Sequence, residues 1–212
     1  MKITPRMLPP EVVQEVKDRV NEQIESDRKN LLLFKCSFRY LSRVERITTI
    51  LKLGLTDREK INQDISFGRI FQGQCYRNCY RCCSMDLEYD VEAFDVLLAY
   101  FLNKAAVSRA YLAGRLSREN LWCGMLEDGL CTIHHNKPYV CLLTSPSPRG
   151  AEKGGCYFKG EKNSKIAVHK QTMVVTRRMR LLFKEWLPEL PEFTGRNMNQ
   201  AFSWALEITD MN

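Results

Sequence analysis

The chain has 212 residues, of which 44% are hydrophobic and 27% are charged, and its formal net charge is +7. The length allows one sizeable core, or one domain with an appended helical arm, and the composition is ordinary for a soluble globular protein. No apolar run of signal-peptide length follows the first residues, and the longest run nearby, residues 31–34, is far too short to span a bilayer. We therefore expect a cytoplasmic protein with no membrane partner, in which clustered cysteines are ligands or catalytic groups rather than disulfides.

The N-terminal part of the chain is predicted to form helices. Apolar residues recur at three- and four-residue steps over residues 8–30 and line one face. A second helical pattern follows and is expected to end at Gly54. The capping-box sequence at residues 56–59 is expected to start a short third helix. Cys36, the one cysteine in this part, is interpreted as a small core residue rather than a ligand.

The middle of the chain combines helices with a short hairpin. An apolar stripe over residues 94–101 predicts a helix, and the helical pattern continues over residues 105–115. The Asp-Gly pair at 128–129 is a strong turn signal between two short apolar runs, so we expect a small β-hairpin there. This hairpin would bring Cys123 and Cys131 near each other.

The C-terminal part is again helical. An apolar stripe over residues 168–186 predicts a long helix that stops at Pro188, and a short terminal helix is expected over residues 197–208. We therefore predict a mainly α fold, in which helices flank a loop-rich central cysteine-cluster region with a small β-hairpin. The expected division is an N-terminal helical arm, a cysteine-cluster metal-binding domain and C-terminal helices that pack on it, at residues 1–66, 67–160 and 161–212 respectively.

Eight of the nine cysteines fall between residues 75 and 156. Cysteine thiolates bind soft or borderline metals: zinc takes four in a closed tetrahedral site, and a four-iron cluster likewise takes four. Ligands two or three residues apart on a turn reach one metal site without strain, as at Cys75, Cys79 and Cys82. Adjacent side chains diverge in most backbone conformations, so one of Cys82 and Cys83 is expected to serve a different ion or to support the first site. The predicted metal ligands are Cys75, Cys79, Cys82, Cys83, Cys123, Cys131, Cys141 and Cys156.

The order of these cysteines resembles that of a known family. The pattern is Cys75-x3-Cys79-x2-Cys82-Cys83, then Cys123, Cys131-x-Ile133, Pro138-x-x-Cys141 and Gly155-Cys156. It is similar to the cysteine-cluster family (CxxCxxCC, or YkgJ-like), which is described as a zinc- or iron-chelating domain and shares eight cysteines. The resemblance covers roughly residues 70–160 and leaves out the flanking helices. The chain has His134, Lys137 and Leu142 where the family commonly has Tyr, Arg and Arg, so a role that depends on the last Arg is not implied here.

The cysteine spacing leaves zinc and iron as alternatives. Paired C-x-x-C knuckles, which are typical of zinc ribbons, are absent, since only Cys79 and Cys82 have that gap. Irregular gaps between the other cysteines favour a cluster held by scattered loops, so we favour an iron–sulfur cluster over zinc. Cys75, Cys79 and Cys82 also have the spacing of the radical S-adenosylmethionine cluster loop. The strands and helices of a barrel do not follow them, which makes this interpretation the weaker one.

The first functional hypothesis is a metal-binding protein used in electron transfer, sensing or metal handling. Some members of the resembled family are linked to flagellin lysine N-methylation, which implies a cluster-dependent methyltransferase with S-adenosylmethionine as a second alternative. However, the sequence lacks the glycine-rich nucleotide loop of an ordinary methyltransferase fold. Whether the chain is an enzyme stays open.

A third hypothesis is a zinc-stapled module that docks nucleic acid or an acidic protein partner. It rests on residues 149–184, which contain ten Lys or Arg residues and two acids. A solvated helix face is the simpler interpretation of this charge, because no nucleic-acid-binding motif accompanies it. His134 and His135 are interpreted as polar loop residues that support the site rather than as ligands.

Overall fold

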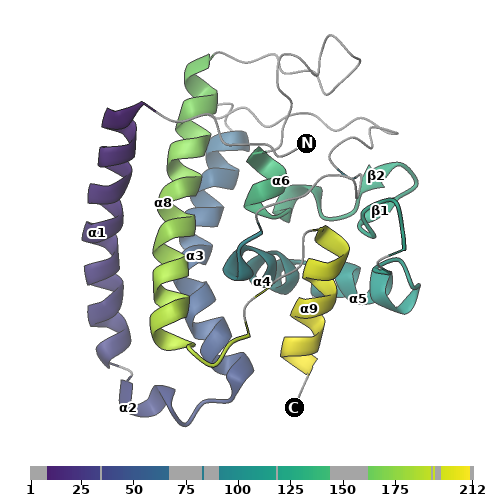
Figure 1. The fold of residues 1–212 in the computed structure, drawn as a ribbon, viewed down its shortest axis with the longest axis horizontal. Coiled ribbons are helices and arrows are strands. Elements are labelled where there is room, and N and C mark those ends of the chain that lie inside the picture. Colours follow the sequence, from purple (N-terminus) through teal and green to yellow (C-terminus); the bar gives the residue numbers. More distant parts are fainter. Residues whose placement is uncertain are drawn as a thin grey trace. The chain divides into compact units, whose positions relative to one another are not determined.

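The structure is a computed structural model, and it describes residues 9–33, 35–66, 83, 91–117, 119–143, 162–191, 193 and 197–210. These residues are mainly helical, as predicted, and their strands form a two-stranded antiparallel hairpin (Figure 1). Their contacts divide them into two compact units, which we describe separately. The helical unit contains residues 9–33, 35–66 and 162–191, and the cysteine unit contains the other described residues.

The helical unit is built from helices at both ends of a long intervening segment. They are α1 (Pro10–Leu33), α2 (Lys35–Phe38), α3 (Arg43–Ser66) and α8 (Lys162–Trp186). Helix α8 lies beside α1 and α3, although residues 67–161 separate it from them in the sequence (Figure 1). The chain therefore leaves this unit after α3 and returns to it with α8.

Helices α1 and α8 run in the same direction and share an apolar seam. Gln23 accepts a hydrogen bond from Arg178, and Arg28 donates one to Glu185. The sequence separation of the partners is nearly constant, 155 and 157 positions, which is expected only for helices that run in the same direction. The buried side chains that close the seam are Val16, Val20 and Val174. Burial of side chains of this size stabilises the folded state by roughly 1.5–3 kcal/mol each.

Helix α3 begins at a capping box and continues past its predicted end. The backbone N–H of Ser42 donates to Glu45 Oε2 at 2.8 Å, and the N–H of Glu45 donates to Ser42 Oγ at 3.3 Å. The prediction that a helix ends at Gly54 is wrong, and so is the prediction that a new helix starts at residues 56–59. A Cβ atom on Gly54 would lie 3.3 Å from the Sδ of Met179. The glycine therefore permits the close approach of α8 within a continuous helix.

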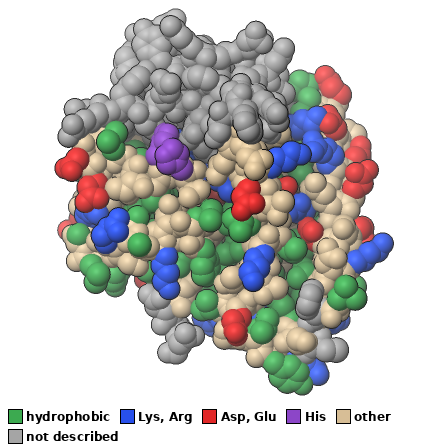
Figure 2. Space-filling model, turned by 180° about the vertical axis from the view of Figure 1, so that it is seen from behind, with side chains coloured by type: hydrophobic (Ala, Val, Ile, Leu, Met, Phe, Trp, Pro, Cys, Tyr) green, Lys and Arg blue, Asp and Glu red, His purple; other side chains and the backbone are tan. Residues whose placement is uncertain are grey.

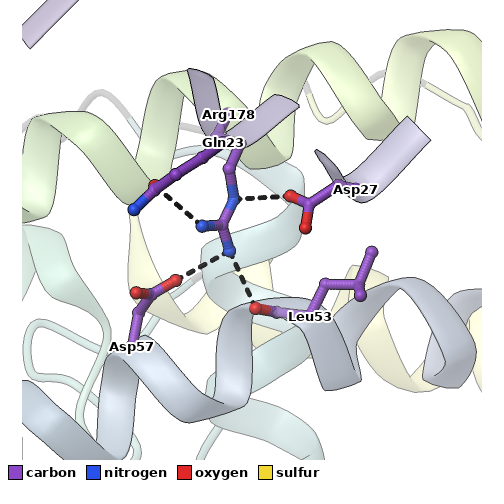
Figure 3. A network of polar contacts seen from close by, with 5 residues as sticks. All are labelled: Gln23, Asp27, Leu53, Asp57 and Arg178. Carbon is purple, nitrogen blue, oxygen red and sulfur yellow. Dashed lines mark hydrogen bonds and ion pairs between the residues drawn. The ribbon is translucent and has the colours of Figure 1, made fainter. Parts of the chain in front are cut away.

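Arg178 of α8 is the centre of a buried polar network that joins α1, α3 and α8 (Figure 3). Its side chain is 5% exposed, and its Nε lies 2.9 Å from the Oδ2 of Asp27. Its Nη atoms donate to Gln23 at 2.9 Å, to the carbonyl of Leu53 at 2.8 Å and to Asp57 at 2.7 Å. Burial raises the pKa of Asp27, the attraction of Arg178 lowers it, and the nearby Asp57 carboxylate raises it further, so that the net shift is upward. Arg178 is thus a structural residue of the basic segment and is withdrawn from solvent.

The cysteine unit is a helical frame that carries several short elements. Its elements are α4 (Ala93–Leu102), α5 (Lys104–Leu112), β1 (Leu126–Glu127), β2 (Leu130–Cys131), the 3₁₀ helix η2 (His134–Asn136), α6 (Tyr139–Leu143) and α9 (Met198–Asp210). Helix α9 contacts both α4 and α5. Every residue from Phe94 to Tyr100 is buried, so α4 is covered on all sides rather than on the one face that the apolar stripe predicted.

The predicted β-hairpin is confirmed. Leu126 faces Cys131 across the ladder, and Asp128 and Gly129 form the turn. Both turn residues have positive φ angles, 49° and 77° respectively, as a type I′ turn requires. The sequence signal at this position was therefore specific, because Asp-Gly is one of the few pairs that adopt this turn without a large steric cost.

The described ranges contain no helix that is both long and apolar enough to cross a bilayer. The division of the chain at residues 66 and 160 stays a prediction. Among the described elements, α8 contacts α1 and α3, whereas α9 contacts α4 and α5.

Candidate metal centre

Half of the predicted metal ligands lie in the described part of the cysteine unit. Cys83 and Cys123 are buried, with exposed fractions of 8% and 9%, and Cys131 and Cys141 are half-buried. No disulfide bond joins any of these four to another described cysteine. Within the described ranges, no three Cys, His, Asp or Glu side chains are grouped so that they could hold a metal ion. The other predicted ligands lie outside the described residues: Cys75, Cys79, Cys82 and Cys156.

The segments that carry Cys83 and Cys123 meet through their backbones. The N–H of Cys123 donates to the carbonyl oxygen of Cys83 at 2.7 Å. The bond joins residues 40 positions apart, so it ties the end of the first cysteine group to the segment before the hairpin. Both thiols are shielded from water, and a buried thiolate is favourable only when a cation or a metal compensates its charge.

The segment after Cys123 is held by Asn199 of α9. This side chain is fully buried, with an exposed fraction of 0%. Its Oδ1 accepts the N–H of Gly124 at 2.7 Å, and its Nδ2 donates to the carbonyls of Ser117 at 3.2 Å and Trp122 at 3.1 Å. One amide therefore satisfies three backbone groups on both sides of Cys123 and fixes the path of the chain through it.

Gly124 allows the chain to pass close to its neighbours immediately after Cys123. A Cβ atom at this position would lie 2.7 Å from the carbonyl oxygen of Arg115 and 2.7 Å from a side-chain carbon of Leu116. Carbon atoms in folded proteins do not approach other atoms so closely, and the first contact is with backbone that cannot easily move. Only glycine fits here without a shift of the segment that carries Cys123.

Cys131 lies on strand β2 of the hairpin. The N–H of Thr132 donates to the carbonyl of Met125 at 2.8 Å, and the N–H of Leu126 donates to the carbonyl of Cys123 at 2.9 Å. Cys123 therefore closes the turn that leads into strand β1. The residue paired with Cys131 is Leu126 rather than Cys123, and the proximity of the two thiols stays a prediction.

Cys141 lies on the short helix α6, which Asp95 of α4 caps. Oδ1 of Asp95 accepts the N–H of Tyr139 at 2.8 Å, and Oδ2 accepts the N–H of Val140 at 3.2 Å. The carboxylate is buried, with an exposed fraction of 3%. Two hydrogen bonds from the first turn of a helix, together with the helix dipole, stabilise a carboxylate in such a position. Cys141 is therefore carried by a helix whose first turn is fixed to α4.

The two neighbouring histidines lie on η2, between the hairpin and α6. The rings of His134 and His135 meet edge to face, with centroids 5.6 Å apart. Asn103 fixes η2 to the end of α4, because its Nδ2 donates to the carbonyl of Asn136 at 3.1 Å. Histidine side chains reach the surface of the face seen in Figure 2. Their support of the site stays a prediction.

The cysteine segments thus share one frame. Cys123 is positioned from α9 and Cys141 from α4, and these two helices pack on each other. The donor set suits zinc or iron, because thiolates are the ligands that both metals accept in four-coordinate sites.

All eight predicted ligands fall in one segment that matches a family model. The family is CxxCxxCC, described as "Putative zinc- or iron-chelating domain", and the match covers residues 74–177. Residues 74–177 are therefore similar to the CxxCxxCC family. No curated protein and no solved structure matches the chain.

The CxxCxxCC match extends further than the cysteine pattern indicated. The resemblance ended near residue 160, whereas the match continues to residue 177 and takes in the N-terminal part of α8.

Sequence reasoning also missed Asp95 and Asn199, which hold the segments around Cys141 and Cys123. The available signal was weak: each is a polar residue near the start of a helix, where such residues usually cap their own helix.

Proposed function

We propose that the protein holds an iron–sulfur cluster or clusters through eight cysteines, with zinc as the alternative metal. The observation that carries the proposal is the family match, which encloses every one of the eight cysteines and is described as zinc- or iron-chelating. Of the described four, Cys83 and Cys123 are held together by a backbone hydrogen bond, and Cys123 and Cys141 are positioned by buried side chains of α9 and α4. The proposed ligands are Cys75, Cys79, Cys82, Cys83, Cys123, Cys131, Cys141 and Cys156.

Iron is preferred to zinc on the spacing of the ligands. The cysteines from Cys83 to Cys156 follow one another at irregular gaps, unlike the paired knuckles of zinc ribbons. A cluster supplies reversible electron transfer, or sensitivity to oxygen, which a zinc ion does not. The protein's own contribution is to exclude water from Cys83 and Cys123 and to fix the loops that carry the thiols.

The proposal is tested by replacing single cysteines with serine and measuring bound metal on anaerobically purified protein. Cys79→Ser is expected to remove most of the metal and to destabilise the cysteine unit, since metal binding contributes folding free energy to a loop-rich region. Cys36→Ser is the matched control, because Cys36 lies on α2 of the helical unit, and it is expected to leave the metal content unchanged. Loss of metal in the Cys36 variant, or full retention in the Cys79 variant, would show that the ligand set is wrong.

A further inference from the structure

The end of the helical unit where α1 meets α2 exposes three large apolar side chains. Leu32 and Leu33, the last two residues of α1, are 53% and 82% exposed. Tyr40, two residues past the end of α2, is 78% exposed. Single exposed apolar side chains are ordinary on a protein surface, whereas several that gather at one place indicate a binding surface. We name residues 29–43, which contain these three, the α1–α2 corner.

The exposed side chains belong to an ordered corner whose other apolar residues face the core. Leu31 is 2% exposed and Phe38 is 5% exposed. The ring of Phe38 packs edge to face on Trp186 of α8, with centroids 5.5 Å apart. The N–H of Tyr40 donates to the carbonyl of Ser37 at 3.0 Å and closes the turn after α2. The exposed apolar residues are therefore held outward by the fold and add nothing to the core.

The same corner is strongly cationic. Between Lys29 and Arg43 the sequence contains four Lys or Arg residues and no acid. Lys29, Lys35 and Arg39 are exposed, and within the described ranges no carboxylate forms an ion pair with any of them. The guanidinium of Arg39 lies over the ring of Tyr40, 5.0 Å from its centroid. Exposed cations around apolar side chains suit a partner that combines negative charge with an apolar phase.

Carboxylates at this end of the helical unit are engaged by other groups. Glu25 and Glu185 both pair with Arg28 at 2.9 Å, and Glu189 pairs with Arg46 at 2.8 Å. The carboxylate of the α3 capping box accepts hydrogen bonds from the N–H and the hydroxyl of its own cap residue. The positive charge of the corner therefore faces solvent and can attract an anionic surface.

We propose that the α1–α2 corner binds the surface of an anionic lipid bilayer. The three exposed apolar side chains enter the boundary between headgroups and acyl chains, and the cations beside them contact lipid phosphates. Tyr40 suits this position, because the aromatic ring is apolar and its hydroxyl stays in the headgroup layer.

A bilayer matches the corner better than a protein or nucleic acid. Helix α2 lies at the outer turn between α1 and α3, so the corner projects from the unit (Figure 1). Lipid accepts projecting apolar side chains without a preformed pocket, whereas a protein partner needs a matching groove. The phosphate backbone of a nucleic acid offers negative charge but no apolar phase for Leu32 and Leu33.

Surface binding requires much less than a spanning segment. The apolar run at residues 31–34 is far too short to cross a bilayer. A few apolar side chains supported by cations are enough for reversible binding at the interface. The proposal therefore replaces the expectation of no membrane partner, which considered only spanning segments. It does not depend on the proposed metal function, because every residue of the corner belongs to the helical unit.

The test is co-sedimentation of the full chain with vesicles of phosphatidylcholine, with and without about one third phosphatidylglycerol. The wild-type protein is expected to bind the anionic vesicles about tenfold more tightly than the neutral ones, and less tightly as salt rises. Leu33→Ser is expected to weaken binding to anionic vesicles about tenfold, because it removes apolar area that enters the lipid. Lys35→Glu is expected to weaken it by about the same factor.

The matched controls are an exposed leucine and an exposed lysine elsewhere. Leu112→Ser, at an 84% exposed position of α5, and Lys52→Glu, at an exposed position of α3, are expected to leave binding unchanged. Thermal melts report whether each variant stays folded, and only folded variants are compared.

Equal binding to neutral and anionic vesicles would overturn the proposal, and so would equal effects of Leu33→Ser and Leu112→Ser. Tighter binding of polyglutamate or of a single-stranded oligonucleotide, dependent on Lys35 and indifferent to Leu33, would also overturn it. Either result would make a soluble acidic polymer the ligand of the corner.

Discussion

Replacing Asn199 by alanine tests whether the frame around Cys123 is fixed in the way the structure describes. The substitution removes the acceptor of the Gly124 N–H and the donor to the carbonyls of Ser117 and Trp122. Leaving a buried polar group without its partner lowers the free energy of unfolding by about 1–3 kcal/mol. The loss is smaller for a carbonyl that water can reach. With one buried donor and two carbonyls affected, we expect the free energy of unfolding to fall by about 3–5 kcal/mol, which is a large share of the stability of an ordinary domain.

The assay is chemical denaturation followed by circular dichroism, combined with metal analysis of the folded fraction. Asn197→Ala is the matched control, because Asn197 immediately precedes α9 and its Oδ1 accepts the N–H of Gln200 in the first turn of that helix at 3.0 Å. Loss of such a cap costs about 1 kcal/mol, and it should leave metal binding unchanged. Asn199→Ala is expected to lower metal content as well as stability, since it releases the segment that carries Cys123. If the two variants behave alike in both measurements, the positioning role of Asn199 is wrong.

The remaining predictions concern the helical unit. Arg178→Met leaves two buried or half-buried carboxylates uncompensated and should lower the free energy of unfolding by about 3–5 kcal/mol, whereas Arg177→Met should have little effect in the same denaturation experiment. The pKa of Asp27 is raised above its ordinary value of 3.8, so its ionisation opposes folding as pH rises from that value through the folded pKa. Asp27→Asn should remove this part of the pH dependence, and parallel stability-versus-pH curves for variant and wild type would contradict it. Gly124→Ala should destabilise the cysteine unit by about 1–3 kcal/mol through overpacking, and an unchanged melting temperature would refute the close approach.

The sequence predicted the helices well where one strong periodicity extended over several turns. The long stripe that ends at Pro188 corresponds to α8, and the terminal pattern corresponds to α9. The Asp-Gly pair at 128–129 predicted the hairpin because its turn requires positive φ at both positions. These features depend on residues that are close together in the sequence, so they can be predicted from a single sequence.

The features that sequence reasoning missed depend on partners far along the chain. Gly54 looked like a helix end because glycine usually ends helices, whereas here Met179, on a helix 125 positions later, approaches it. Arg178 looked like its neighbour Arg177, since only the folded bundle shows which of the two meets Asp57. Asn199 had the appearance of a helix cap, although its partners lie 75 to 82 positions earlier.

The candidate metal site was predicted from the sequence more fully than the frame that holds it. Thiols at close spacing have few alternative roles, so the eight cysteines identified both a family and a chemistry. The spacing cannot distinguish zinc from iron, because both metals accept four thiolates in a tetrahedral arrangement. Which thiols share an ion depends on the folded path of the loops, and no pattern of residues specifies that path.

The most direct test of the central claim is quantification of iron, zinc and acid-labile sulfide in anaerobically purified protein, alongside a count of reactive thiols after denaturation. We expect iron and sulfide in comparable amounts, and both should be lost from the Cys79→Ser variant. Stoichiometric zinc without sulfide would show that the cysteines bind zinc, the alternative metal, and not an iron–sulfur cluster. Protein free of both metals, with its eight clustered cysteines joined to one another as disulfides, would contradict the account.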